Sequence, residues 1–256
     1  MRSAHQLIPV SDLRELNLVE ESFGYYKLQV SESNPLGKRA VFKCKDTSIS
    51  EVFGYLLAQL LGVPVAEFQG VWFEKEVKLP GGYVASANHL GILIEVIPNL
   101  CLISMEQLAT RDKALVAKLL SFYFFARYEW PQAFCSPTSS YVLDLERIGP
   151  VMLVDELECT LGKDIGEELS FREDEYSQTS QDYLKQILCY ANELHVEGEL
   201  CEEFQLISRI SRETFQQNLA VKGHPYSHLL SSSFLSAVTK RQEAISQGRI
   251  GTRPSP

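Results

Sequence analysis

The stretch KRAVFKCKDTSISEVFGYLLAQLLGVPV, residues 38–65, places one lysine and one glutamate in otherwise apolar surroundings. Residues 39–45 alternate as a β-strand does, so Lys43 shares a face with Val41 while Phe42 and its neighbours form an apolar face. Residues from about 48 to 61 repeat their large apolar side chains at the period of a helix. The stretch therefore predicts a strand that carries Lys43, followed by a helix that carries a glutamate in its first turn.

Glu51 lies on the side of this predicted helix opposite the large apolar stripe, in line with Gly54, Tyr55 and Ala58. Small residues on that side would let another element approach closely. One interpretation makes Glu51 a surface residue that favours the helix dipole, with Lys43 extending to water. The other makes Glu51 hold Lys43 so that its ammonium group contacts phosphate oxygens, as in protein kinases.

The rest of the chain divides into a strand-rich part and a helix-rich part. Before Pro98, strands are predicted at 25–31, which would form a hairpin with 39–45, and at 70–79, 83–87 and 90–97. After Pro98, helices are predicted at 104–129 (with a Ser104–Gln107 capping signature), 182–195, 201–220 and 232–246. A β-hairpin is predicted at about 141–155 and a mobile acidic loop at 163–182.

Strands followed by helices are typical of an α+β fold, here with two lobes that share a cleft. The expected organisation is a β-rich N-lobe over residues 1–98 and a mainly helical C-lobe over 99–246 that carries the 141–155 hairpin. Residues 247–256 are expected to be a flexible tail.

Composition limits the classes of partner. The chain has 256 residues, a net charge of −9 and a pI near 5.2, which argues against a general nucleic-acid or anionic-membrane binder. No apolar run approaches the ~20 residues that span a bilayer, so no transmembrane segment is expected. Six cysteines without a CxxC pair are expected to be reduced thiols of a cytoplasmic protein.

Several motifs occur in an order that resembles the kinase domain of HipA-like proteins, within the phosphatidylinositol-kinase-like and protein-kinase-like fold. They are GYYKLQV (24–30), GKRAVFKCKD (37–46), ISEVFGYLLAQLLGVPVAEF (49–68), HLGILIEVIP (89–98), FYFFARYEW (122–130), YVLDLERIGPVMLVDELECT (141–160) and FLSAVTKRQEAIS (234–246). The resemblance covers nearly the whole chain. It implies a two-lobed kinase-like fold that binds ATP with Mg²⁺.

The resemblance also implies roles for individual residues. Lys43 would contact the phosphates and Glu51 would pair with it, while the backbone from Glu95 to Ile97 would meet adenine. The turn that covers the phosphates would contain Ser22 and Gly24.

The metal and the catalytic base are assigned to the later motifs in the same way. Asp155 would hold Mg²⁺, and Gln132 is the nearest amide in place of the family's asparagine, which helps to hold the metal. Glu129 is the candidate catalytic base. Simpler alternatives are that Asp155 caps a turn at a strand end and that Glu129 lies in an exposed turn.

The stretch 127–140 departs from the family pattern, because it contains neither the expected aspartate nor the following asparagine. Two hypotheses follow. The chain is a kinase that transfers the γ-phosphoryl group to a hydroxyl of an unidentified substrate, or it is a pseudokinase that acts through protein–protein contacts. An α+β interaction domain unrelated to kinases is a third.

Overall fold

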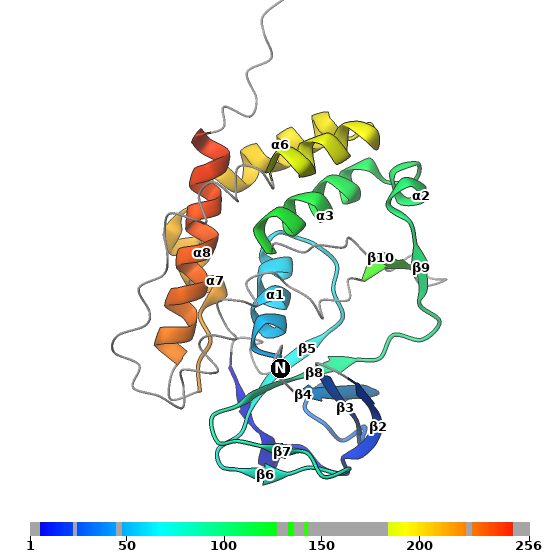
Figure 1. Ribbon diagram of the computed structural model, residues 1–256, viewed down its shortest axis with the longest axis vertical. Coiled ribbons are helices and arrows are strands. Elements are labelled where there is room, and N and C mark those ends of the chain that lie inside the picture. Colours follow the sequence, from blue (N-terminus) through cyan, green and yellow to red (C-terminus); the bar gives the residue numbers. More distant parts are fainter. Residues whose placement is uncertain are drawn as a thin grey trace, which may run out of the picture.

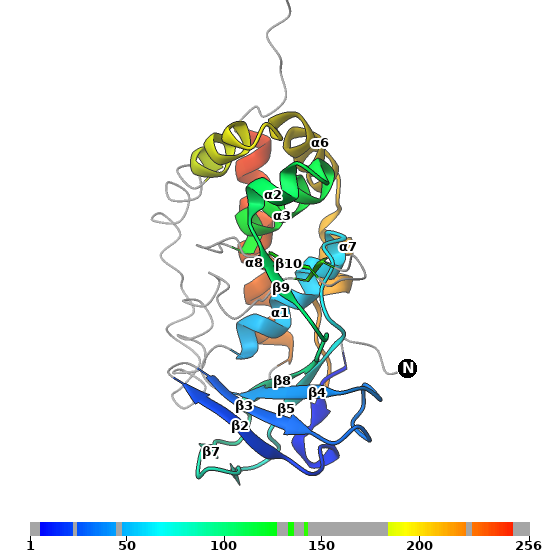
Figure 2. The same ribbon diagram turned by 90° about the vertical axis from the view of Figure 1, so that its right-hand side faces the viewer.

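The computed structural model describes residues 6–22, 25–44, 48–126, 133–135, 141–142, 184–223 and 227–247 (Figure 1). It is a mixed α/β protein with one main β-sheet and several helices. The main sheet lies at one end of the molecule and most helices lie at the other end (Figures 1 and 2). This segregation is compatible with the predicted α+β class.

The main sheet has six strands in the order β1-β5-β8-β4-β3-β2. Only the β1–β5 pair is parallel, and every other neighbouring pair in this sheet is antiparallel. The predicted hairpin of 25–31 with 39–45 is confirmed, since β3 and β4 are antiparallel neighbours. The strands are β1 (Ile8–Pro9), β2 (Asn17–Ser22), β3 (Tyr25–Val30), β4 (Ala40–Cys44), β5 (Phe68–Trp72) and β8 (Leu90–Glu95).

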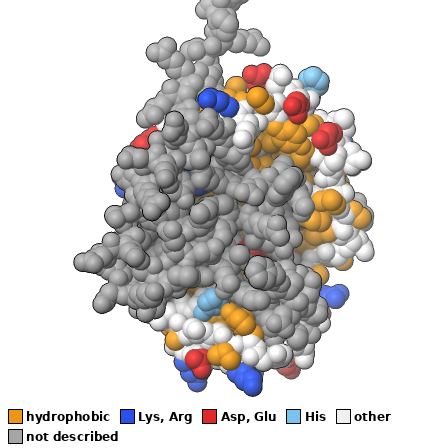
Figure 3. All heavy atoms as spheres, in the orientation of Figure 1, with side chains coloured by type: hydrophobic (Ala, Val, Ile, Leu, Met, Phe, Trp, Pro, Cys, Tyr) orange, Lys and Arg blue, Asp and Glu red, His pale blue; other side chains and the backbone are white. Residues whose placement is uncertain are grey.

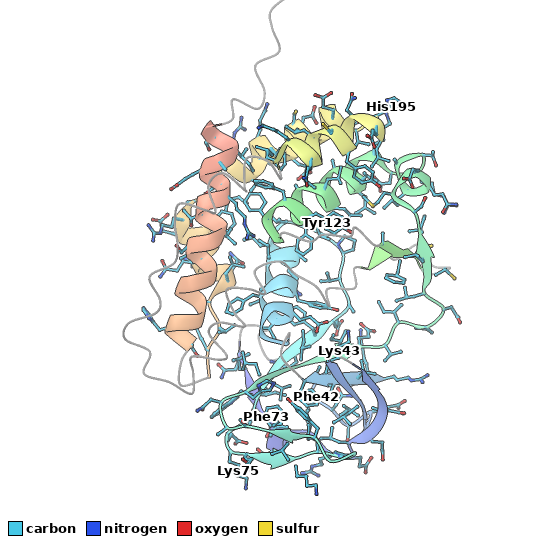
Figure 4. The ribbon with its side chains drawn as sticks, in the orientation of Figure 1. Phe42, Lys43, Phe73, Lys75, Tyr123 and His195 are labelled. Carbon is cyan, nitrogen blue, oxygen red and sulfur yellow. The ribbon has the colours of Figure 1, made fainter. Side chains whose placement is uncertain are left out.

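Helix α1 (Ser48–Leu60) packs on one face of this sheet, against β8 and β5. On that face Ile92 belongs to the larger hydrophobic core, which continues through α1 into the other helices. On the opposite face, Phe42 and Phe73 belong to a second, smaller core. Figure 4 shows these two rings on the side of the sheet away from α1. The central strands β4, β5 and β8 are therefore largely buried on both faces.

The prediction of one strand over 70–79 is wrong, because the chain leaves the main sheet after Trp72. Phe73 donates its N–H to the His89 carbonyl at 2.9 Å and accepts the Asn88 N–H at 2.7 Å. These two bonds hold Phe73 beside the residues that precede β8. The chain between Phe73 and Asn88 then forms a separate hairpin of β6 (Val77–Lys78) and β7 (Val84–Ala85). The other predicted strands, at 83–87 and 90–97, correspond to β7 and β8.

A small three-stranded sheet was not predicted in full. It has the order β11-β10-β9 and consists of β9 (Cys101–Ile103), β10 (Ala133–Cys135) and β11 (Tyr141–Val142). Only β11 falls in a predicted strand. Three residues are too few to display an alternating pattern, and β9 and β10 pair across a long sequence separation.

The predicted helix at 104–129 is two helices, α2 (Met105–Ala109) and α3 (Lys113–Ala126), within the residues that the structure describes. The capping box of Ser104 with Gln107 is confirmed at the start of α2. The break has a local cause, because the Asp112 carboxylate accepts the Leu115 N–H at 2.9 Å and so caps α3.

The predicted helix at 201–220 is also two helices, α6 (Glu197–Ser208) and α7 (Arg212–Leu219). Here Ser211 is the new N-cap, since its hydroxyl accepts the Thr214 N–H at 3.1 Å. The remaining helices span 184–193 and α8 (Ser227–Gln247). They agree in type with the helices predicted at 182–195 and 232–246.

Helix α8 packs against α3, α6 and α7. Its buried Arg241 donates from Nη1 to the Phe125 carbonyl near the end of α3. The neighbouring Gln242 donates from Nε2 to the carbonyls of Ile207 and Ile210, at 2.9 and 2.8 Å. Two adjacent side chains of α8 thus satisfy carbonyl groups at the C-terminal ends of two other helices.

Most of the predicted 141–155 hairpin, the acidic loop at 163–182 and most of the tail lie outside the described residues. Among the helices that are described, none combines the length and apolar character that crossing a bilayer requires.

Candidate functional site

Lys43 lies in the middle of the main sheet, on the face that α1 covers (Figure 4). Its Cα partners are Lys27 on β3 and Ile92 on β8. Val41, two residues earlier on the same face, packs against the larger core. The strand alternation that places Phe42 in the smaller core therefore directs Lys43 toward α1.

Glu51 occupies the first turn of α1 and faces the sheet. Its relative exposure is 2%, and Gly54, Tyr55 and Ala58 on the same side of the helix are also buried. The interpretation of Glu51 as a surface residue is therefore wrong. Gly54 and Ala58 leave room for close approach on this side of α1, and the large apolar side chains of the helix, such as Leu57, are buried as well.

Lys43 and Glu51 form an ion pair, as predicted. The distance from Lys43 Nζ to Glu51 Oε1 is 3.3 Å, and the side chains are 8% and 3% exposed. Burying either charge alone would be unfavourable by several kcal/mol, which the opposite charge offsets. The pair therefore fixes the position of α1 relative to β4.

The end of β8 is held in place by a second set of charges. Lys38 Nζ lies 2.9 Å from Glu67 Oε1 and 3.0 Å from Glu95 Oε1. The side-chain hydrogen bonds to Glu67 and then Glu95 raise the pKa of Lys38. Sequence analysis missed this contact, because it depends on strand pairing between β5, β8 and the start of β4.

The backbone that follows β8 is partly committed to hydrogen bonds. The N–H groups of Glu95 and Val96 each donate at 2.8 Å, to the carbonyls of Glu67 and Arg39. The backbone N–H of Ile97 donates no hydrogen bond to any described residue. Pro98, the next residue, has no N–H to donate.

Of the other predicted site residues, one is described and four are not. Ser22 ends β2 in register with Tyr25, so residues 23–24 connect β2 and β3. Gly24, Glu129, Gln132 and Asp155 lie outside the described residues. Their predicted roles, and the distance from Asp155 to Lys43, stay predictions.

Metal ligands are not gathered elsewhere in the described part of the chain. No group of three or more His, Cys, Asp or Glu side chains in those residues could hold a metal ion. The predicted Mg²⁺ ligands, Asp155 and Gln132, are not among those residues, because they lie in segments that the structure does not describe.

Comparison with known proteins gives no family for this chain. No protein-family model matches the sequence, and no curated protein matches it significantly.

Proposed function

We propose that this protein binds Mg·ATP through a kinase-like site built on Lys43 and Glu51. The observation that carries the proposal is the buried ion pair between Lys43 on β4 and Glu51 in the first turn of α1. Protein kinases use a strand lysine held by a glutamate of the following helix. Here β4 is the third strand of the β2-β3-β4 meander and α1 is the helix that follows it.

The lysine side chain suits a phosphate contact. Its ammonium group carries three N–H donors, so contact with Glu51 is compatible with contact to phosphate oxygens. Because the Lys43 side chain is only 8% exposed, nucleotide binding must involve a local rearrangement that increases access to Nζ. The sheet supplies a rigid base for the lysine, and the ion pair limits its range of rotamers.

The adenine ring would contact the backbone after β8. The Ile97 N–H is the donor that we assign to this contact, since the N–H groups of Glu95 and Val96 already donate to other carbonyls. The Lys38 contacts with Glu67 and Glu95 would keep this backbone in place. Ser22 and Gly24 would lie at the phosphate-covering turn between β2 and β3.

The full proposal is a two-lobed, HipA-like kinase fold. The γ-phosphoryl group would pass to a hydroxyl substrate mainly through positioning and charge neutralisation. Asp155, with Gln132 nearby, is the proposed Mg²⁺ ligand, and Glu129 is the proposed base.

A pseudokinase is the second candidate function, because residues 127–140 contain no aspartate and no asparagine. In that case the fold would bind nucleotide without transferring phosphate, and would act through a protein partner. The two candidates share the nucleotide site and differ in turnover.

Thermal denaturation with and without Mg·ATP tests the shared site. We expect Mg·ATP to raise the melting temperature of the full chain, and the shift to be lost in Glu51→Gln and Lys43→Met. Lys75→Met is the matched control, because Lys75 is exposed and lies on the far side of the sheet from α1 (Figure 4). Absence of a nucleotide-dependent shift in the native protein would overturn both candidates.

Transfer of labelled γ-phosphate separates the two candidates once binding is established. Transfer to the protein itself, to generic protein substrates or to lipids, with loss in Lys43→Met, would support the kinase. Nucleotide binding without transfer to any of these acceptors would favour the pseudokinase.

A further inference from the structure

Two cysteines are direct neighbours across the small β-sheet. β9 and β10 are antiparallel, and Cys101 on β9 is the Cα partner of Cys135 on β10. Directly opposed residues in an antiparallel pair have Cα atoms about 4.5 or 5.5 Å apart, depending on the hydrogen-bonding pattern. Both separations lie within the range of about 4.4–6.8 Å that a disulfide requires.

The pair lies at the rim of the hydrophobic core. Ile103 and Ala133, the pair at the other end of the β9–β10 ladder, are 5% and 1% exposed. Cys101 is exposed and Cys135 is half-buried, and both are free thiols. Figure 3 shows hydrophobic side chains at the surface on the right-hand side of this face, the region that β9 occupies in Figure 1. A small reagent can therefore reach Cys101, and Cys135 lies beside it on the same face of the sheet.

The other described cysteines are less suited to such a reaction. Cys44 is fully buried in the sheet. Burial raises the pKa of the Cys201 thiol, with a further contribution from Glu197, so less of it is the reactive thiolate. Cys189 is exposed, but it lies on the helix at 184–193 and not in the small sheet.

We propose that Cys101 and Cys135 form a reversible disulfide when the protein meets a low-molecular-weight disulfide such as oxidised glutathione. The Cys101 thiolate attacks one sulfur of the reagent, forms a mixed disulfide and releases one thiolate. The Cys135 thiolate then attacks the Cys101 sulfur, forms the Cys101–Cys135 bond and releases the second thiolate. The two cysteines are oxidised, the reagent is reduced to two thiols, and the two cysteine protons pass to solvent or to the released thiolates.

This disulfide would join two segments that flank the helical pair α2 and α3. Cys101 follows Ile97 by a short connection, and Cys135 follows the stretch that contains Glu129 and Gln132. The bond would close residues 101–135 into a ring and restrict how these two segments move relative to each other. The proposal does not depend on nucleotide binding.

The test uses the full chain, purified under reducing conditions and then exposed to oxidised glutathione. After alkylation of the remaining thiols, we expect mass spectrometry to show a peptide pair linked through Cys101 and Cys135, with no glutathione retained on either of these two cysteines. The melting temperature should rise by about 5–10 °C and return when the bond is reduced.

Single substitutions separate this pair from other thiols. Cys135→Ser should leave glutathione attached to Cys101, while Cys189→Ser, the matched exposed control, should leave the Cys101–Cys135 link unchanged. Cys101→Ser provides a second variant if Cys135→Ser does not fold. A stable glutathione adduct on Cys101 in the native sequence, a link to a different cysteine such as Cys159, or no reaction would each overturn the proposal.

Discussion

Lys43 and Glu51 form an ion pair in the core of the protein. Each residue is an ionisable group in an apolar stretch, and each is 6% exposed or less. A buried ion pair is weak evidence for stability by itself, because desolvation of both charges offsets much of their attraction. Its retention in the core therefore suggests a requirement for the charges, which is the basis of the proposed phosphate contact.

The stability of this pair can be measured with a double-mutant cycle. Lys43→Met leaves Glu51 as a buried charge without this partner, and we expect a loss of about 3–5 kcal/mol in the free energy of unfolding. Glu51→Leu should cost a similar amount. The double variant should lose much less than the sum, because it leaves neither charge in the core. Urea unfolding of the four proteins gives the coupling energy, and additive losses would show that the two charges do not stabilise each other.

Glu203 on α6 should make stability depend on pH in the opposite direction to a paired carboxylate. Burial, followed by the nearby Glu202, raises its pKa, and Lys118 partly opposes this effect. A raised pKa means that the folded state binds the proton more tightly, so this contribution is present at low pH and is lost as the pH rises through the folded pKa.

Replacement of Glu203 by glutamine removes that pH dependence. We expect Glu203→Gln to stabilise the protein at pH 7 by less than about 1 kcal/mol, because solvent screens a half-exposed group. The gain should vanish near pH 3.5, where the native carboxyl is protonated too. Thermal melts at both pH values, with the exposed Glu243→Gln as control, provide the measurement. A gain of equal size at both pH values would contradict this account.

At the scale of elements, the position of α8 depends on polar contacts with the ends of other helices as well as on its apolar face. Arg241 and Gln242 donate to carbonyls at the C-terminal ends of α3 and α6. Carbonyls at a helix end lack the regular partner of the helix interior. The Ile207 carbonyl also accepts the Ile210 N–H at 3.0 Å, so Gln242 adds a further hydrogen bond there. α8 thereby orients α3, the helix that leads to the stretch 127–132.

Loss of these two side chains should have graded effects. Arg241→Met removes a charged donor from a buried carbonyl, and we expect a cost of about 2–3 kcal/mol. Gln242→Ala removes two neutral hydrogen bonds nearer the surface and should cost about 1–2 kcal/mol. Glu243→Ala, an exposed neighbour on the same helix, should change stability by no more than about 0.5 kcal/mol. Urea unfolding ranks the three variants, and equal losses would rule out a capping role for α8.

Element type was predictable wherever a periodic pattern was long. Helix α1 and strands β3, β4 and β8 follow directly from their apolar periods. Helix breaks were harder, because Asp112 and Ser211 interrupt patterns that remain apolar on both sides. The strands β9 and β10 depend on pairing between segments far apart in the chain, which no local pattern contains.

At the scale of the molecule, the sequence could predict a pair of charges but not the full environment of the site. The helical period placed Glu51 opposite the large apolar stripe of α1 and left a surface position and a pairing with Lys43 as alternatives. The 3.3 Å contact decides for the pairing. Lys38 was not predicted to reach Glu67 and Glu95, because its position depends on the register of three strands. Side-chain period is a local property, and register is a property of the assembled sheet.

The larger hydrophobic core extends from the main sheet to α8 without interruption, and this continuity predicts cooperative unfolding. Its members include Ile92 on β8, Leu57 on α1, Phe124 on α3 and Val238 on α8. Since the main sheet and the helices share one core, loss of packing in either should destabilise the other, and we expect a single transition.

Two probes on opposite sides of this core can test that expectation. Trp72 on β5 packs against the core from the sheet, and Trp130→Phe makes it the only tryptophan. Its fluorescence should report the same midpoint in urea as far-UV circular dichroism, which is dominated by the helices. Phe124→Ala should lower the free energy of unfolding by about 3–5 kcal/mol, since its ring packs edge-on against Phe204 in the helical part of the core. Both urea midpoints should then fall together. A shift in the circular dichroism midpoint while the Trp72 midpoint stays constant would mean that the main sheet unfolds independently of the helices.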